Sequence, residues 1–408
     1  MKTKNILFLS NGHGEDTHNC QIIQAFSKIC PEAKLSAMPI VGAGNNYKNL
    51  GIPIIAPTAN MPSGGFFYLN PLFLFKDVGQ GLISLTWQQL QAVWKFSKNC
   101  DLIMATGDIV VAAIAYSTKL PYVVFLSADS SYYEGQINLG LILPKLLNNS
   151  RCLKVFARDA LTAKDLNRQG IKKAEFVGTP VMDNLISTGK NLQLKAGLFT
   201  IGILPGSRLP EAGRNLSLLL KLVKEIVKVM GENVCQFRAA TVPILMSELE
   251  AFALHSAGIA TSEGWQYQAG KLTFLTEEYS IEVICYEDAF ADILQQSNLV
   301  IGMAGTAIEQ AVGLGKPIIT IPGEGPSFTY RFAEAQTRLL GCSVQVIGKQ
   351  PANNFIRQKA AEKVKQTLTD KEYLKTCIQN GFERMGRPGG SEKIADYLIQ
   401  YLSSCLVD

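Results

Sequence analysis

Short apolar runs alternate with amphipathic stretches along this chain, and the first run of each half enters a turn of small and polar residues. Residues 5–10 lead into Asn11-Gly12-His13-Gly14, and residues 199–204 lead into Pro205-Gly206-Ser207-Arg208. Apolar runs of this length, each followed by a helical pattern, predict strands of a parallel sheet joined by crossover helices. The repeated opening indicates that the two halves share one plan.

A second strand-to-helix turn occurs in each half. Residues 298–302 run into Met303-Ala304-Gly305-Thr306, with Glu309 one turn further on, and residues 101–108 follow the same order before a helical stretch at 109–117. Further strands are expected at 122–126, 154–157, 174–177, 271–275, 282–286 and 318–321, and further helices at 216–229 and 289–296. Two such series predict an α/β protein with two Rossmann-like domains that face one another across a cleft.

The domain boundaries follow from the same pattern. A length of 408 residues suits two domains, each with its own core. We expect a first domain over residues 1–185 and a second over 196–385, because the polar stretch 186–195 is typical of a linker. Residues 386–408 contain a final amphipathic helix, which is expected to pack back on the first domain.

Composition excludes several classes of protein. With 47% hydrophobic and 18% charged residues, the chain is globular rather than disordered. Nine cysteines without a Cys-x-x-Cys pair, and only three histidines, argue against a metal site and indicate reduced thiols in a cytoplasmic protein. The basic residues behind the net charge of +5 are dispersed, which argues against a nucleic-acid partner. A homo-oligomer is compatible with the sequence but not required by it.

The most apolar segment, residues 66–75, is half as long as a membrane-spanning helix and contains Pro71. One interpretation is a buried segment packed under the first domain. The other is an exposed apolar lip that dips into a bilayer, where Trp87 and Trp94 with Lys76, Lys95 and Lys98 would suit the headgroup zone. The sequence therefore leaves peripheral attachment to a membrane surface open.

The turns of the second half suit a nucleotide-sugar donor. Small residues let the backbone approach a ligand, and the N-terminus of a helix offers free N–H groups to a diphosphate. Arginine would neutralise the diphosphate, and a carboxylate one turn into the helix can accept hydrogen bonds from a ribose diol. The predicted donor-binding residues are Arg158, Gly206, Ser207, Arg208, Gly305, Thr306 and Glu309. The alternatives are an ordinary small-residue turn of an α/β protein and, for Arg208, a surface ion pair with Glu211.

Transfer of a glycosyl group needs a base for the acceptor hydroxyl. His13 is the first candidate, because a histidine titrates near neutrality and its flanking glycines leave it room to meet an acceptor. Asp108 is the second, either as the base or as the group that orients His13. The alternative for His13 is a capping or packing role on the following helix. Glu15 and Asp16 are expected to cap that helix, and His18 is expected at the surface.

Four segments carry a resemblance to a known family: Leu204-Pro205-Gly206-Ser207-Arg208, Gly178-Thr179-Pro180-Val181-Met182-Asp183, Gly305-Thr306-Ala307-Ile308-Glu309 and Gly315-Lys316-Pro317. Their order resembles that of the lipid-A-disaccharide synthase family of GT-B glycosyltransferases. The opening Ser10-Asn11-Gly12-His13-Gly14-Glu15-Asp16 is similar to the cyanobacterial and plastid-type relatives, the lipid-A-disaccharide synthase-related proteins. The resemblance implies an acceptor-binding first domain, a UDP-sugar donor on the second, and a lipid acceptor at the cytoplasmic face of a membrane.

The expected function is therefore a hexosyltransferase that takes its sugar from a UDP-sugar and requires no cofactor. The absence of an Asp-x-Asp motif favours a mechanism without a metal ion. A UDP-sugar 2-epimerase of the same fold, and a non-catalytic protein that binds a nucleotide sugar or a lipid, are the alternatives. The first loop differs from the Gly-Glu-x-Ser-Gly-Asp of lipid A synthases, and Gly178-Thr179-Pro180 stands where that family has Gly-His-Pro.

Overall fold

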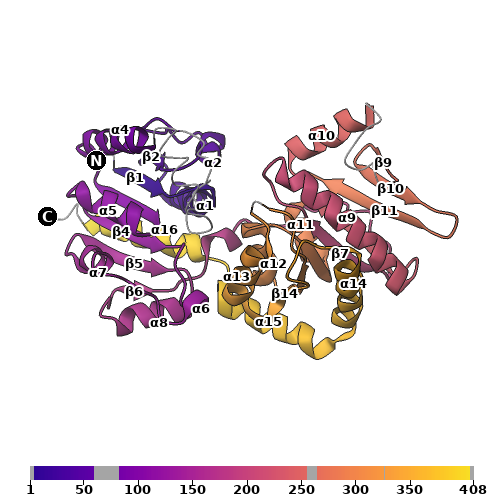
Figure 1. The fold of residues 1–408 in the computed structure, drawn as a ribbon. Helices are drawn as coiled ribbons and strands as arrows, with labels where there is room; N and C mark the ends of the chain where they lie inside the picture. Colours follow the sequence, from indigo (N-terminus) through magenta and orange to yellow (C-terminus); the bar gives the residue numbers. More distant parts are fainter. Residues whose placement is uncertain (1–3, 59–81, 255–263, 326, 405–408) are drawn as a thin grey trace. The chain divides into compact units, whose positions relative to one another are not determined.

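The structure is a computed structural model that describes residues 4–58, 82–254, 264–325 and 327–404. The chain forms two compact units. The first comprises residues 1–183 together with 386–408, and the second comprises residues 184–385 (Figure 1). The apolar segment 66–75, predicted as a buried segment or a membrane lip, lies outside the described residues.

The first unit is built on a parallel sheet of six strands in the order β2-β1-β3-β4-β5-β6. Nearly every residue of the central strands is buried, as the continuous apolar runs predict. The strands are β1 (Asn5–Ser10), β2 (Lys34–Pro39), β3 (Leu102–Gly107), β4 (Tyr122–Leu126), β5 (Cys152–Ala157) and β6 (Ala174–Glu175).

Helices cover both faces of this sheet (Figure 1). Apolar side chains of α1 (His13–Ile29) and α16 (Gly390–Ser404) form one core with the sheet. The core of the other face includes α5 (Ile109–Ser117), α7 (Leu143–Asn148), α8 (Ala160–Arg168) and part of α4 (Leu82–Ser97). Shorter elements are α2 (Asn45–Asn49), α6 (Ser131–Glu134) and η1 (Pro180–Met182).

The second unit contains eight strands in the order β14-β13-β12-β7-β8-β11-β10-β9. The strands from β14 to β11 run parallel, and β9–β10–β11 form antiparallel pairs at one edge. The strands are β7 (Phe199–Leu204), β8 (Cys235–Ala240), β9 (Trp265–Gln268), β10 (Lys271–Leu275), β11 (Ser280–Tyr286), β12 (Leu299–Gly302), β13 (Ile318–Thr320) and β14 (Val344–Val346).

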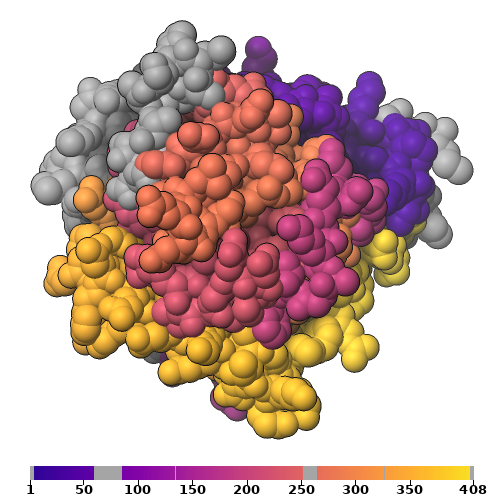
Figure 2. Space-filling view, turned by 90° about the vertical axis from the view of Figure 1, so that its right-hand side faces the viewer, coloured from indigo at the N-terminus to yellow at the C-terminus, as the bar shows by residue number. Residues whose placement is uncertain are grey.

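A local turn explains the antiparallel edge. Ala269 and Gly270 both have positive φ values, 48° and 82°, and they join two strands through a two-residue connection. Positive φ at both central residues is the requirement of the turn type that matches the twist of a hairpin. In Figure 2 the β9–β11 region of this unit is seen in orange.

The described α-helices of the second unit range from 7 to 20 residues in length. They are α9 (Glu211–Met230), α10 (Pro243–Leu254), α11 (Phe290–Gln296), α12 (Thr306–Gly313), α13 (Tyr330–Leu340), α14 (Asn354–Thr369) and α15 (Lys371–Met385), with η3 at Gly341–Ser343. Leucine and valine side chains of α9 lie in the core with α14. The predicted α/β class with two Rossmann-like domains is confirmed.

The stretch 186–195, expected as a linker, is packed on the second unit. The carboxylate of Asp292 accepts hydrogen bonds from the Ser187 and Thr188 hydroxyls and from the Gly189 backbone N–H. Leu192 is buried in a small apolar cluster of this unit. These residues therefore behave as a fixed strap rather than a free linker.

The two segments that connect the units are joined by a cluster of backbone contacts inside the first unit. Asp183 accepts hydrogen bonds from the backbone N–H groups of Gly389 and Ser391, at 2.5 and 2.7 Å, and from the Ser391 hydroxyl. A Cβ on Gly178 would lie 2.6 Å from the carbonyl oxygen of Arg387, so only glycine allows this approach. We call this cluster the Asp183 clasp.

Candidate functional site

In the first sheet the strand order reverses between β1 and β3, so the crevice at their carboxyl ends is the usual place for a ligand in an open α/β sheet. The turns that follow these strands touch. A Cβ on Gly107, whose φ is 145°, would lie 2.9 Å from Cγ of Asn11. His13 and Asp108 follow on these two turns, so both predicted catalytic residues lie at this edge.

His13 is the first residue of α1, and its side chain is exposed. The N-cap residue of this helix is Gly12, and no side-chain hydrogen bond caps it. Asp108 is the N-cap of α5, where its Oδ1 accepts a hydrogen bond from the Val110 N–H at 2.7 Å. Asp108 therefore has a structural task as a helix cap, which was not predicted from the sequence.

Asp16 and His18 are buried, and the predictions of a helix cap and of a surface histidine are wrong. Asp16 is 1% exposed and accepts a 2.6 Å hydrogen bond from the Ser10 hydroxyl. Burial raises the pKa of its carboxyl to about 7, partly opposed by the Ser10 hydrogen bond. His18 is 5% exposed and packs edge-on against Phe125; burial first, and the charge of Arg158 second, lower its pKa to about 3.

Three further side chains complete the network around Asp16. The Ser10 hydroxyl lies 2.7 Å from the Tyr47 hydroxyl, and the Asn19 amide donates to both the Tyr47 oxygen and the Leu9 carbonyl. The Thr106 hydroxyl donates to Asn19 at 2.6 Å. These bonds link β1, α1, α2 and β3 directly behind the turns that carry His13 and Asp108.

Arg158, predicted to bind the donor, follows β5 in the first unit, whereas the other six predicted donor residues belong to the second. Its Nη1 donates to the Ser127 carbonyl at 2.7 Å. Asp129, two residues beyond Ser127, was not singled out from the sequence. Burial first, and the negative charge of Asp108 second, raise the pKa of its carboxyl to about 6.

The second sheet repeats this arrangement between β7 and β12, where its strand order reverses. The Met303 N–H donates to the Leu204 carbonyl at 2.8 Å. The Asn215 side chain, on α9, donates to the Pro205 carbonyl at 3.0 Å and to the Met303 carbonyl at 3.3 Å. Residues 205–208 and 303–306, predicted to hold a diphosphate, therefore form one joined pair of turns.

The glycines of this pair have different tasks. Gly206 has φ of 97°, and a Cβ there would lie 3.1 Å from the Met303 carbonyl oxygen, so the turn itself requires glycine. Gly305 precedes α12, and a Cβ built on it would meet nothing within 4 Å. Packing within the described residues does not explain Gly305, whereas the close approach of a ligand to the backbone would.

The polar residues around these two turns differ in how far they are exposed to solvent. Ser207 and Arg208 are exposed, Thr306 begins α12, and Glu309 lies half-buried in its first turn. Glu211, the alternative partner considered for Arg208, is buried and accepts hydrogen bonds from the Ser327 and Phe328 N–H groups, at 2.8 and 2.9 Å. It thereby holds Ser327 and Phe328 against α9.

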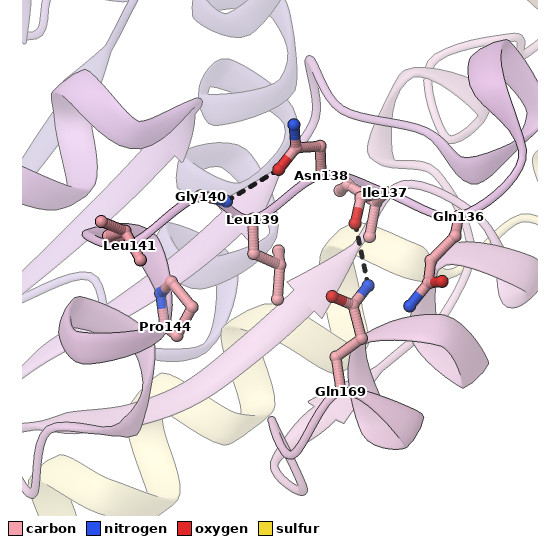
Figure 3. A pocket seen from close by; sticks show the side chains of 8 residues that line it. All are labelled: Gln136, Ile137, Asn138, Leu139, Gly140, Leu141, Pro144 and Gln169. Atoms are coloured by element: carbon pink, nitrogen blue, oxygen red, sulfur yellow. Dashed lines mark hydrogen bonds between the residues drawn. The ribbon is translucent and has the colours of Figure 1, made fainter.

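A separate open pocket of 510 Å³ lies on the first unit (Figure 3). The Gln169 side chain donates to the Ile137 carbonyl, and the Asn138 side chain accepts from the Gly140 N–H, so these carboxamides brace the wall. None of the predicted site residues lines it. The lining residues are Gln136, Ile137, Asn138, Leu139, Gly140, Leu141, Pro144 and Gln169.

In the part of the chain that the structure describes, no group of three or more His, Cys, Asp or Glu residues could hold a metal ion. The cysteines in that part of the chain are free thiols, of which Cys20, Cys100, Cys152, Cys285 and Cys377 are buried. No described helix is long and apolar enough to span a bilayer.

No family profile matches this chain. The chain is 20% identical to a lipid-A-disaccharide synthase of Syntrophotalea carbinolica over 96% of this chain and 94% of the other. Its fold matches that of CalG4, the calicheamicin glycosyltransferase, with a TM-score of 0.60 at 12% identity, over 99% of this chain and 100% of that one.

The fold also matches that of the UDP-GlcNAc 2-epimerase of Neisseria meningitidis, solved with UDP-GlcNAc. Here the TM-score is 0.52 at 14% identity, over 97% of this chain and 100% of the other. The chain thus has the fold of GT-B glycosyltransferases and their epimerase relatives, with two Rossmann-like units.

Proposed function

We propose that this protein is a glycosyltransferase that moves a sugar from a UDP-sugar to a lipid-linked acceptor at the cytoplasmic face of a membrane. One observation carries the proposal. The turns 205–208 and 303–306 are joined where the second sheet reverses its strand order, and Gly305 leaves open space there. A diphosphate would accept hydrogen bonds from the N-terminus of α12, beside Ser207 and Arg208, and Glu309 would hold the ribose.

The comparisons support a nucleotide-sugar donor. A structural relative with the same fold was solved with UDP-GlcNAc, and a full-length relative is a lipid-A-disaccharide synthase. In this proposal the acceptor binds the first unit, at the edge that carries His13, Asp108 and Arg158. No metal ion is required in this proposal, because arginine and helix-terminal N–H groups can stabilise the leaving diphosphate.

A lipid-linked acceptor is favoured by the surface of α4, α5 and α7. Trp87, Trp94 and Tyr116 are exposed there, and Leu141 just before α7 is 86% exposed. None of the three helices contains an Asp or Glu, whereas Lys95 and Lys145 lie on them. Exposed aromatic rings beside cations suit the headgroup zone of an anionic bilayer.

The epimerase alternative is kept because relatives with the same fold carry that name. The two functions differ in what they consume. An epimerase acts on the UDP-sugar alone, whereas a transferase releases UDP only when an acceptor is present. Titration with UDP, followed by thermal unfolding, tests the donor site: UDP should raise the melting temperature, and Glu309→Ala should remove most of that rise. An equal rise in the variant would take Glu309 out of the site.

A further inference from the structure

Four strands that are neighbours in the first sheet, β1, β3, β4 and β5, are each followed by an ionisable residue at the carboxyl edge. These residues are His13, Asp108, Asp129 and Arg158. Parallel strands place their carboxyl ends along one edge, so the four side chains belong to one row. The function proposed above uses three of them and gives no task to Asp129.

The turn that carries Asp129 is tied down on both sides. The backbone N–H groups of Ser127 and Ala128 donate to the Gly107 carbonyl, at 3.1 and 3.5 Å, which fixes the turn beside Asp108. On the other side, the Ser130 hydroxyl donates to Asp159 at 2.7 Å. Asp129 is therefore held between two anchored residues, as a group that must meet a substrate needs to be.

The described residues leave the carboxylate of Asp129 without a structural task. Asp129 is half-buried, and within the described residues no hydrogen bond or ion pair engages it. The hydroxyl of Ser127, on the same turn, is 2% exposed and has no hydrogen-bond partner in the described part of the chain. Buried polar groups are normally paired, so the open Ser127 hydroxyl beside the Asp129 carboxylate favours a ligand at this edge of the sheet.

The other candidates for the base are less suited. His13 is exposed, and Asp108 is engaged in capping α5. Resting on the transferase function proposed above, we propose that the Asp129 carboxylate accepts the proton of the acceptor hydroxyl. The acceptor oxygen then bonds to the anomeric carbon, the bond from that carbon to the diphosphate breaks, and UDP leaves with the electron pair. Asp108 is a positioning residue in this scheme.

Burial and a neighbouring charge determine the pKa of the Asp129 carboxyl. Asp108 lies on the neighbouring turn, and its negative charge raises the pKa of Asp129 further than burial alone. Other charged groups near this turn have partners of their own: Arg158 donates to the Ser127 carbonyl, Asp159 accepts from Ser130, and Asp165 accepts from Ser131. The titratable groups nearby are His18, which packs against Phe125, His13 at the same edge, and Tyr132 and Tyr133 on α6. With a pKa of about 6, the carboxylate is mostly ionised at neutral pH yet remains a competent base.

Two variants and one pH series test the assignment. Asp129→Asn should lower turnover by roughly 10²–10⁴-fold while the rise in melting temperature with UDP is kept. Asp108→Asn retains a good cap, so α5 should stay folded. This variant should lose less activity and move the acidic limb of the pH–rate profile to lower pH, because the neighbouring charge is gone.

Measuring the pH–rate profile in a series of cosolvents distinguishes a carboxylate base from a histidine base. Lower solvent polarity raises the pKa of a carboxyl, which creates charge on ionisation, and hardly changes that of an imidazolium, so the acidic limb should move to higher pH. Turnover of Asp129→Asn within threefold of wild type, with UDP released, would overturn the assignment and leave the transferase standing. A wild-type protein that never releases UDP with any lipid acceptor would overturn both.

Discussion

The hydroxyl of Ser10 donates a 2.6 Å hydrogen bond to the carboxylate of Asp16 inside the first unit, where Asp16 is almost completely shielded from water. Burial raises the pKa of this carboxyl to about 7, against 3.8 for the ordinary group. The folded state therefore binds a proton here that the unfolded state releases between about pH 4 and 7. Because the unfolded state binds fewer protons over that range, Asp16 makes stability fall as pH rises.

Asp16→Asn removes this ionisation and keeps an acceptor for Ser10. We expect the variant to gain stability over wild type as pH rises from 5 to 8, by roughly 3 kcal/mol at most. Urea unfolding at both pH values measures the difference.

Asp292→Asn is the control, because its effect on stability should have the opposite sign. Burial alone would raise the pKa of Asp292, but hydrogen bonds from Ser187, Thr188 and Gly189 outweigh it and lower the pKa to about 2, so this variant should lose stability at neutral pH. Parallel pH profiles for Asp16→Asn and wild type would contradict the account of Asp16.

The Asp183 clasp should contribute to the stability of the first unit. Asp183→Ala removes the acceptor for two backbone N–H groups and one hydroxyl of the 389–391 segment. Hydrogen bonds to a charged group contribute about 1.5–3 kcal/mol, so we expect a loss in that range in urea unfolding. Asn353→Ala, which removes a single cap of α14, should cost only about 1 kcal/mol. Equal losses in the two variants would show that the clasp is an ordinary cap.

Gly305 and Gly206 should respond differently to alanine. Space is open around Gly305, so Gly305→Ala should fold with nearly the wild-type melting temperature and yet lose most of its stabilisation by UDP. Gly206→Ala should lower the melting temperature itself, because its backbone is left-handed and the Met303 carbonyl is close. Thermal unfolding with and without UDP measures both effects. Full stabilisation of Gly305→Ala by UDP would mean that no ligand approaches this backbone.

The surface of α4, α5 and α7 should attach the protein to anionic vesicles. Trp87 and Trp94 pack edge to face at 5.9 Å and are 52% and 38% exposed, so replacing both with glutamine should release the protein. The cost in stability should be modest but not zero, because the Trp94 indole also donates to the Ser117 hydroxyl. Sedimentation with phosphatidylglycerol vesicles measures attachment. The control pair is Ile244→Gln with Phe355→Gln, two residues of similar exposure on the second unit. Release by the control pair to the same extent would show non-specific adhesion.

The parallel part of the fold was predicted well from the sequence, because buried strands are recognisable as continuous apolar runs. The strand at 122–126 and the helix at 109–117 have the predicted bounds. β2 was not predicted, since Lys34-Leu35-Ser36-Ala37-Met38-Pro39 mixes polar and small residues and becomes buried through pairing with β1. The helix α4 was likewise not predicted, although Trp87 and Trp94 on it were expected to suit a membrane surface.

The site was predicted in part. Residues directly after strands were found, because small residues and charges stand out there. His18 was expected at the surface, since a polar residue early in a helix gives no sign of the packing that buries it. Asn215 could not be found, because its role depends on two carbonyls, Pro205 and Met303, that are far apart in sequence. Asp129 lies three residues beyond its strand, past the usual place of a site residue.

The most direct test of the proposed function incubates the protein with sugar-labelled UDP-GlcNAc and a membrane lipid extract. Released UDP and label in the organic phase are measured together. The account predicts that UDP release depends on the lipid and that label enters the organic phase in the same amount. Conversion of UDP-GlcNAc into a free epimer without lipid, or lipid-independent loss of the donor with no labelled lipid, would contradict it.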